Sequence, residues 1–276
     1  MRSRMDKGNK PFKRLLLTGA AGNLGRILRV AMRDWADIVR CTDIAPMQAA
    51  GPGEEVIQAD LADRAAMLAI AEGVDAIVHM GGISVEAPFD DVMQANILGT
   101  YNLYSAAQKQ GVRRVIYASS NHAIGFYKTT EVIDANDPVR PDSMYGISKC
   151  FGESMSRYYF DRFGIETVCM RIGSAYEAPQ NTRMLVTYIS FADLIELVRC
   201  SLFATRVDHT IVFGMSDNPA KWWDNTKAAH LGFVAKDSSR PFADRFPIEG
   251  PIDTSDITRL HHGGPYVLLG PMEPKS

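Results

Sequence analysis

Short apolar runs alternate along the first two-thirds of the chain with longer stretches in which apolar residues recur every three or four positions. The runs predict buried strands, over Lys13–Thr18, Ile38–Asp43, Val56–Ala59, Asp75–Met80, Arg113–Ser119 and Glu166–Ile172. The periodic stretches predict helices, over Asn23–Asp34, Asp63–Glu72, Phe89–Gln110 and Ser143–Phe163. Near-continuous apolar strands separated by helices indicate an α/β fold with a doubly wound parallel sheet. In such a sheet, ligands bind at the carboxyl ends of the strands.

The alternation changes after Ile172. A helix over Phe191–Phe203 and a strand over Thr210–Phe213 are predicted, Trp222–Asn225 is expected on or beside a helix, and the C-terminal stretch is rich in Pro and Gly. We expect residues 1–11 to form a loose tail and residues 12–276 to form a single domain. Within that domain, residues from about 173 to 276 are predicted to contribute a small substrate lobe.

Composition and charge narrow the classes of partner. The 276-residue chain has 46% hydrophobic and 22% charged residues and a net charge of −2, which are ordinary values for a globular protein. The chain has no cluster of Lys and Arg that would indicate binding to nucleic acid. Its basic N-terminus lacks the apolar segment of a signal peptide, and no apolar run is long enough to span a membrane. We therefore predict a cytoplasmic protein without a nucleic-acid or membrane partner.

The four cysteines lie far apart in the sequence and form neither a C-x-x-C motif nor a metal-ligand spacing. Free buried thiols in a reducing compartment are favoured over disulfides. No metal site is predicted. The adjacent His261 and His262 lack a third ligand nearby in sequence and are interpreted as non-ligands.

Three glycines follow the first predicted strand and lead into the first predicted helix. Gly19, Gly22 and Gly25 allow a tight turn and close approach of the backbone to a phosphate. The N-terminus of the helix then favours an anion. The spacing is G-x-x-G-x-x-G rather than G-x-G-x-x-G, so a tight strand–helix turn without a ligand is the alternative. The strand–turn–helix context favours a dinucleotide.

Two carboxylates follow this loop at strand ends. Asp43 closes the second strand and can accept hydrogen bonds from both ribose hydroxyls of an adenosine. The next residues, Ile44 and Ala45, offer no cation for a 2′-phosphate, which favours NAD over NADP. A solvated acid at a strand end is the alternative for Asp43. Asp60 could flank the adenine, but Asp is also common at the N-cap of a helix.

A tyrosine and a lysine four residues apart, Tyr145 and Lys149 in the motif YGISK, lie on one face of a predicted helix. A tyrosine hydroxyl has an ordinary pKa of about 10, and a nearby ammonium favours the phenolate. The pair can therefore serve as a general acid or base. Ser120, at the end of the fifth predicted strand, can hydrogen-bond a substrate hydroxyl and help Tyr145 take its proton.

These features occur in the order found in the extended short-chain dehydrogenase/reductase family, which the chain resembles from residue 13 to about 175. The motifs are TGAAGNLG, Asp43, Asp60-Leu61, Gly81-Gly82, Asn96, Ser120 and YGISK. The resemblance implies a Rossmann-type fold and catalytic roles for Ser120, Tyr145 and Lys149. It also implies that Asn96 orders a water near the lysine. The residues assigned to NAD are Gly19, Gly22, Asn23, Leu24, Gly25, Asp43, Asp60, Leu61, Met80, Gly81, Gly82, Asn96, Tyr145 and Lys149.

More specific stretches resemble the uronate dehydrogenases as far as about Phe233. They are MGGISVEAPF, SSNHAIGFY, YGISKCFGE, RIGS, the run from Arg183 to Leu185, and WWDN. This resemblance implies NAD-dependent oxidation of the anomeric hydroxyl of galacturonate or glucuronate to an aldarolactone. It places Ser84, Ser120, Asn121, His122, Ser174 and Arg183 around the sugar. Self-association is common in this family and is expected here.

The residue types suit a sugar acid. Short polar side chains can bind hydroxyls, and an arginine can hold a carboxylate through two parallel hydrogen bonds. Arg183 is the candidate for this role, with a surface arginine in a polar loop as the alternative. His122 could equally be a structural residue, but its position after Ser120 and Asn121 favours contact with the sugar. Trp222 and Trp223 are assigned to packing.

Two other functions are compatible with the scaffold. A nucleotide-sugar epimerase or dehydratase would need a larger C-terminal lobe for the diphosphate, whereas few residues follow the sixth strand here. A non-catalytic NAD-sensing regulator would usually lose the tyrosine or the lysine of the YGISK motif, and this chain keeps both.

Overall fold

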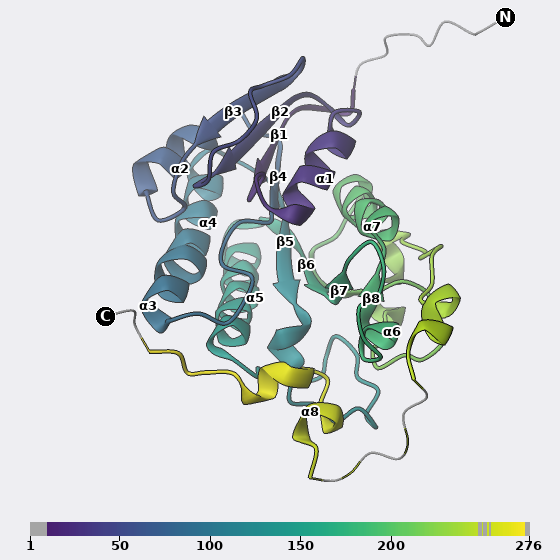
Figure 1. Ribbon diagram of the computed structural model, residues 1–276. Coiled ribbons are helices and arrows are strands. Elements are labelled where there is room, and N and C mark those ends of the chain that lie inside the picture. Colours follow the sequence, from purple (N-terminus) through teal and green to yellow (C-terminus); the bar gives the residue numbers. More distant parts are fainter. Residues whose placement is uncertain (1–9, 248–249, 251–252, 254, 274–276) are drawn as a thin grey trace, which may run out of the picture.

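The computed structural model describes residues 10–247, 250, 253 and 255–273. Its centre is a parallel seven-stranded sheet with the strand order β3-β2-β1-β4-β5-β6-β9 (Figure 1). The strands are β1 Phe12–Thr18, β2 Ala36–Asp43, β3 Glu54–Gln58, β4 Ala76–His79, β5 Arg114–Ser120, β6 Glu166–Ile172 and β9 His209–Gly214. The order reverses between β1 and β4, and this switch point leaves a crevice for ligands at the carboxyl ends of the strands. The predicted doubly wound α/β fold is confirmed.

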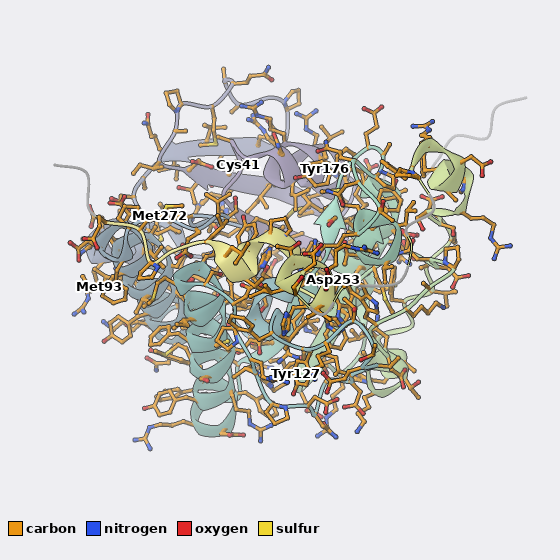
Figure 2. All side chains as sticks on the ribbon, turned by 60° about the horizontal axis from the view of Figure 1, so that its bottom comes forward. Cys41, Met93, Tyr127, Tyr176, Asp253 and Met272 are labelled. Carbon is orange, nitrogen blue, oxygen red and sulfur yellow. The ribbon has the colours of Figure 1, made fainter. Side chains whose placement is uncertain are left out.

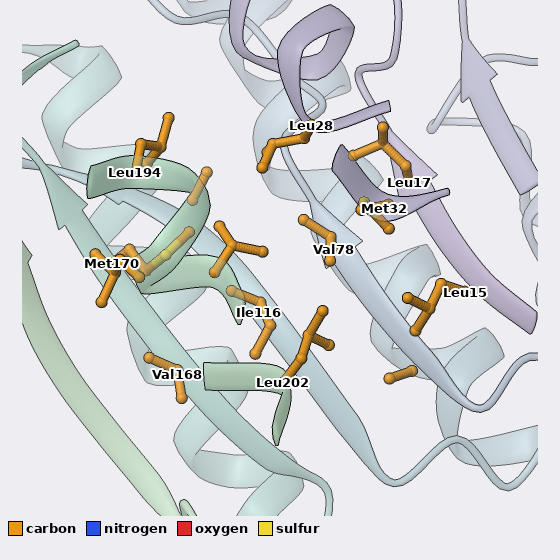
Figure 3. Close-up of a cluster of buried hydrophobic side chains, with 14 of the residues drawn as sticks. Leu15, Leu17, Leu28, Met32, Val78, Ile116, Val168, Met170, Leu194 and Leu202 are labelled. Carbon is orange, nitrogen blue, oxygen red and sulfur yellow. The ribbon is translucent and has the colours of Figure 1, made fainter. Parts of the chain in front are cut away.

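Helices cover both faces of the sheet. The main ones are α1 Asn23–Met32, α2 Arg64–Ile70, α4 Gly99–Lys109, α5 Met144–Phe163 and α7 Phe191–Phe203. Helices α1 and α7 pack together on one face, and α2, α4 and α5 pack on the other (Figure 1). Figure 3 shows the first of these cores, in which Leu28 and Leu194 from the helices meet Leu17, Ile116 and Met170 from the strands. Burial of this apolar surface on both faces is the main force that holds the sheet.

The sequence located the main elements to within a few residues, but it missed an interruption in one helix. The predicted helix Phe89–Gln110 consists of α3 Phe89–Val92, the π-helical turn η1 Met93–Leu98 and α4. The sequence also missed two strands of two residues each, β7 Ser174–Ala175 and β8 Tyr188–Ile189, with α6 Met184–Thr187 between them. Strands this short carry no readable periodicity.

The residues after 173 contribute to two parts of the structure, the main sheet and a separate apolar cluster. Strand β9 completes the main sheet and α7 covers it, so these elements belong with the first part of the chain. A separate apolar cluster joins Ile124, Tyr127 and Ile133 to Phe213 and Trp223. The segment between β5 and α5 therefore packs against residues of β9 and beyond, and Ile133 N–H donates to the Trp222 carbonyl across the two segments.

The last described residues cross the carboxyl ends of the strands. This C-terminal strap, residues 257–273, contains α8 Ile257–Leu260 and the 3₁₀ turn η5 Gly264–Leu268. It passes below β5 and α5 in Figure 1, and Figure 2 shows it running to Met272 near the helix that carries Met93. Of the predicted N-terminal tail, residues 1–9 lie outside the described residues, and the ammonium of Lys10 donates to the Ala36 carbonyl at 2.9 Å.

Candidate active site

The glycine loop has the geometry of a phosphate cradle. Gly19 has φ +69°, and a Cβ at this position would lie 2.6 Å from the Met80 backbone. A Cβ at Gly25 would lie 2.0 Å from the Gly19 carbonyl oxygen, so only glycine permits this contact. Gly22 is the N-cap of α1 without a side-chain cap, and no acidic residue occupies the first turn. The N–H groups at this end of α1 therefore suit the negative charge of a pyrophosphate.

The two strand-end carboxylates that were predicted to contact the adenosine differ in their surroundings. Asp43 accepts hydrogen bonds from the Ala21 and Ala45 N–H groups, both at 2.9 Å, so it lies against the glycine loop. Asp60 is exposed and accepts from Ala62 N–H, as a turn residue does. Leu61 packs against Gly81 and Gly99. The structure thus places Asp43 and Leu61 beside the crevice and gives Asp60 only a local contact.

A buried histidine supports the turn after β4. Thr18 Oγ1 accepts a hydrogen bond from Gly81 N–H at 3.1 Å and forms a second hydrogen bond with His79 Nδ1 at 2.7 Å. Burial, and then the charge of Lys149, lowers the pKa of His79 to about 3. His79 is therefore neutral at pH 7. The contact of Thr18 with His79 and Gly81 fixes the turn through Met80, Gly81 and Gly82 that was predicted to face the cofactor.

The lowered pKa of His79 has a consequence for stability. Well above pH 7 the imidazole is neutral in both folded and unfolded chains and adds no pH dependence. As the pH falls from 6.5 towards 3, the unfolded chain binds a proton that the folded chain does not. The free energy of unfolding then decreases by about 1.4 kcal/mol per pH unit from this group. In urea denaturation, His79→Asn should lack this component between pH 7 and 5, and equal slopes for variant and wild type would contradict it.

The Asn96 side chain is hydrogen-bonded within the protein. Its amide nitrogen donates to the Ile83 carbonyl at 3.0 Å and to Ser148 Oγ at 2.8 Å, and its oxygen accepts from Ile83 N–H at 2.8 Å. Both amide hydrogens are therefore used within the protein. The Asn96 side chain therefore joins the loop after Gly82 to α5, and an ordered water between Asn96 and Lys149 stays a prediction. Asn96 lies in the π turn η1, whose extra residue the sequence did not reveal.

The same loop is fastened a second time by Glu86, which the sequence analysis did not single out. Glu86 is buried, and its Oε2 accepts from Tyr145 N–H at 2.9 Å in the first turn of α5. The loop between these two attachments carries Ser84, which is exposed. Ser84 is therefore held in a defined position relative to the N-terminus of the helix that carries Tyr145.

The predicted catalytic side chains come together. Tyr145 and Lys149 are buried on α5, and the Lys149 ammonium lies 5.5 Å from the centre of the Tyr145 ring. The ammonium donates to the Ala118 carbonyl at 2.9 Å, which ties it to the end of β5. Ser120, the last residue of β5, accepts from His122 N–H at 3.1 Å and hydrogen-bonds the Tyr145 hydroxyl.

The direction of the Tyr145 shift is opposite to the prediction. Burial raises the pKa of Tyr145 to about 12, although the hydrogen bond with Ser120 opposes this. Burial also lowers the pKa of Lys149 to about 8. In the protein alone the phenol is therefore neutral at pH 7, because the effect of burial outweighs that of the hydrogen bond with Ser120. Ionisation of this phenol needs further positive charge in the site.

Arg183 precedes α6 and is held by two contacts. Its Nε donates to the His262 carbonyl at 2.7 Å. With the Asn121 amide oriented by its hydrogen bonds, the amide oxygen accepts from Arg183 Nη2 at 2.7 Å and its nitrogen donates to the Ile172 carbonyl at 3.1 Å. Burial lowers the pKa of Arg183 to about 10, so it remains a cation at pH 7.

The Asp142 carboxylate acts on the charge of Arg183 without pairing with it directly. Within the part of the chain that the structure describes, Arg183 forms no ion pair, and its Nη1 makes no hydrogen bond. A largely buried cation in this state is costly unless an anion joins it. The side chain is therefore suited to receive a carboxylate from a ligand.

Two other predicted substrate contacts are already bonded within the protein. The Asn121 amide contacts Arg183 and Ile172, as described, and therefore supports the arginine. Ser174, in β7, forms a hydrogen bond with Thr187 Oγ1 at 2.8 Å and is buried. His122, in contrast, presents part of its ring to the site: its side chain is 12% exposed.

The C-terminal strap completes the site, and sequence reasoning assigned it no contact. Tyr266 stacks on His122 with ring centres 3.7 Å apart, and Gly263 N–H donates to the Gly125 carbonyl at 2.8 Å. His262 stacks on Trp222 at 4.8 Å and accepts a hydrogen bond from Trp223 Nε1, which fits the predicted packing role of both tryptophans. The region lacks periodicity, and these contacts join segments far apart in sequence.

The described residues offer neither a metal-binding cluster nor a membrane-spanning helix. They contain no group of three or more His, Cys, Asp or Glu side chains that could hold a metal ion. They also contain no helix that is both long and apolar enough to cross a bilayer. All four cysteines have free thiols.

The chain is similar to proteins of known family. The NAD dependent epimerase/dehydratase family matches residues 15–194. A uronate dehydrogenase of Pseudomonas putida is 53% identical over 95% of this chain and 98% of its own length. A solved uronate dehydrogenase from Agrobacterium tumefaciens, a tyrosine-to-alanine variant complexed with NAD, is 44% identical over 95% of this chain and 100% of its own, with a TM-score of 0.90. A glucuronic acid dehydrogenase structure from Chromohalobacter salexigens is also 44% identical, over 94% of this chain and 97% of its own, with a TM-score of 0.89.

Proposed function

The chain belongs to the NAD dependent epimerase/dehydratase family and, within it, to the uronate dehydrogenases, and on this premise we propose how its residues oxidise a hexuronate. The reaction is NAD-dependent oxidation of the C1 hydroxyl of galacturonate or glucuronate to the aldarolactone. The observation that carries the proposal is the joint placement of the buried Tyr145–Lys149–Ser120 group and the unpaired cation of Arg183 at one edge of the sheet.

Residues of the switch point hold the cofactor. The glycine loop at the N-terminus of α1 takes the pyrophosphate, and Asp43 takes the adenosine ribose. The turn through Gly81 and Gly82 lies against Asn96 and Leu61 and faces the nicotinamide side. When bound, NAD⁺ supplies the hydride acceptor and a positive charge on its nicotinamide ring.

Arg183 and its neighbours orient the sugar. The guanidinium binds the C5 carboxylate, and His122 and Ser84 contact hydroxyl groups. Binding the carboxylate at Arg183 leaves C1 to reach Tyr145, because His122 lies near both side chains. Holding the two reacting parts in place is a major part of what the protein contributes to the rate.

Tyr145 is the general base. Its phenolate removes the proton from the C1 hydroxyl, while Ser120 hydrogen-bonds the same hydroxyl and keeps it aligned. Lys149 stabilises the phenolate through its charge and is itself held by the Ala118 carbonyl. Burial alone keeps the Tyr145 phenol neutral. The base therefore becomes active only when the site also holds positive charge, so proton abstraction is limited to the enzyme with NAD⁺ bound.

Three broader properties are also part of the proposal. We propose that residues 12–276 act as one NAD-binding domain and that the enzyme is cytoplasmic, which the free thiols support. We propose that it self-associates. An apolar hollow of about 320 Å³ lined by Met93, Ile97, Leu98, Tyr101 and Phe151 supports this, since exposed apolar surfaces of this kind often mark protein contacts.

The test of this function is the appearance of NADH at 340 nm with a panel of sugars. We expect turnover with galacturonate or glucuronate and at least about a hundredfold lower kcat/KM with glucose or galactose, because neutral hexoses leave Arg183 unpaired. UDP-sugars should give no net NADH, as the strap covers the site.

The same panel separates the rival functions. Conversion of a UDP-sugar without release of NADH would indicate an epimerase or dehydratase. Tight NAD binding with no oxidation of any sugar acid would indicate a sensor. Either result would overturn the proposed function.

A further inference from the structure

A buried carboxylate forms a hydrogen bond with His122. Asp142 Oδ2 lies 2.8 Å from His122 Nδ1, and the Asp142 side chain has no solvent exposure. Two glycines from distant parts of the sequence pack against the Asp142 carboxylate. A Cβ at Gly125 would lie 1.8 Å from Oδ2, and a Cβ at Gly263 of the C-terminal strap would lie 2.0 Å from it. The contact between Asp142 and His122 is therefore enclosed and shielded from water.

The hydrogen bonds around Asp142 decide where the protons lie. Ser143 Oγ accepts from Gly146 N–H at 3.0 Å, so the serine hydrogen is directed to Asp142 Oδ1 at 2.9 Å. The carboxylate thus already accepts one hydrogen bond and lies in the field of Arg183. An ionised carboxylate has no hydrogen to give, so His122 Nδ1 must donate to it.

The opposite nitrogen of His122 faces the site. Within the described residues, His122 Nε2 makes no hydrogen bond. Tyr266 stacks on one face of the ring and prevents it from turning over. The charged groups that act on His122 are Asp142 and Glu86, which favour the imidazolium, and Arg183, which disfavours it; Tyr145 lies edge-on. Burial is the largest effect and lowers the pKa of His122, so the ring is neutral at pH 7.

We propose that Asp142 determines substrate specificity through His122, by fixing the tautomer in which Nε2 carries a lone pair. The site then presents two recognition groups of opposite kind: Arg183 offers hydrogen-bond donors for a carboxylate, and His122 Nε2 offers an acceptor for a ring hydroxyl. This rests on the proposed function. It implies that a uronate must carry a hydroxyl, rather than an acceptor such as a phosphate or a second carboxylate, at the position that meets His122.

The tautomer can be measured without turnover. In ¹⁵N-histidine-labelled wild-type protein at pH 7.5, two-bond ¹H–¹⁵N correlation spectra distinguish the two neutral tautomers and the imidazolium. The His122 signals are assigned by their loss in His122→Gln. We expect a neutral ring with the hydrogen on Nδ1. A hydrogen on Nε2, or an imidazolium, would overturn the proposal whether or not the enzyme acts on uronates.

A substitution tests the consequence for the substrate. In Asp142→Asn, Ser143 directs its hydrogen to the amide oxygen, so the amide nitrogen faces His122 and forces Nδ1 to accept. Nε2 then becomes a donor. We expect KM for galacturonate to rise about 10- to 100-fold with kcat within about threefold, and the NMR tautomer to switch.

The matched control is Asp193→Asn. Asp193 is likewise buried and accepts hydrogen bonds from the Lys236 and Asp237 N–H groups, but it lies in the first turn of α7, and the hydrogen bonds that it makes within the described residues involve no histidine. This variant should keep the KM and the His122 tautomer.

An Asp142→Asn protein that folds, switches tautomer and retains its KM would contradict the role of Asp142 in specificity. If that variant fails to fold, monodeoxy-galacturonates test the wild type: one of them should lose about tenfold or more in kcat/KM, and that loss should be absent in His122→Gln.

Discussion

Replacing Tyr145 by Phe should reduce kcat for galacturonate by about three orders of magnitude and leave the Kd for NAD within about twofold. The substitution removes one oxygen, and the aromatic ring keeps its buried position over Lys149. Loss of a positioned general base costs about 10²- to 10⁴-fold in rate. The measurement is steady-state NADH formation, with NAD binding followed separately by calorimetry.

Tyr158→Phe provides the control for this substitution. Tyr158 lies on the same helix but is 52% exposed and far along it from the first turn. It should retain wild-type kcat. If Tyr145→Phe kept a rate near that of the wild type, Tyr145 would not be the base, and the placement of C1 beside it would also be wrong.

Replacing Arg183 by Met should raise KM for uronates by about 10²- to 10³-fold. Methionine keeps much of the apolar volume of the side chain but removes the charge and every donor. Truncating one partner of a desolvated, hydrogen-bonded ion pair costs about 2–5 kcal/mol. The guanidinium is also fixed before substrate arrives, by the His262 carbonyl and the Asn121 amide, so little entropy is lost on binding.

Two further variants, one at Arg183 and one control, test why KM rises in Arg183→Met. Arg183→Lys keeps the charge but not the planar fork, and should fall between wild type and Arg183→Met. Arg162→Met, at the far end of α5 against Phe163, is the control and should leave KM unchanged. An unchanged KM in Arg183→Met would remove Arg183 as the carboxylate ligand, and the substrate would then need another anchor.

Local sequence patterns were sufficient for the part of the site that depends on one turn or one helix. The glycine loop, Asp43 and the pair Tyr145–Lys149 are each set by spacing within a single strand–turn–helix unit or a single helical face. Their relative positions follow from the parallel sheet, since the carboxyl ends of its strands lie along one edge. The fold class was predictable for the same reason.

The remainder of the site depends on contacts between distant segments. Asp142 becomes a partner of His122 only because the chain reverses before α5, and Tyr266 reaches the same ring from the C-terminal strap. Neither residue lies in a periodic stretch. The contact between the Asn96 amide and Ile83 was not predicted, because it depends on the π turn η1. The direction of the Tyr145 shift was mistaken because burial cannot be measured from spacing alone.

We propose that the hydroxyl oxygen of Tyr145 contacts the C1 hydroxyl of a uronate whose carboxylate is bound by Arg183. The most direct measurement is a crystal structure of Tyr145→Phe with NAD and galacturonate, in which slow turnover preserves the substrate. We expect the C1 oxygen within about 3.2 Å of the position that the Tyr145 hydroxyl occupies in the native protein, and the carboxylate in contact with Arg183. A sugar bound in the reverse direction, with its carboxylate at residue 145 and C1 at Arg183, would contradict the account.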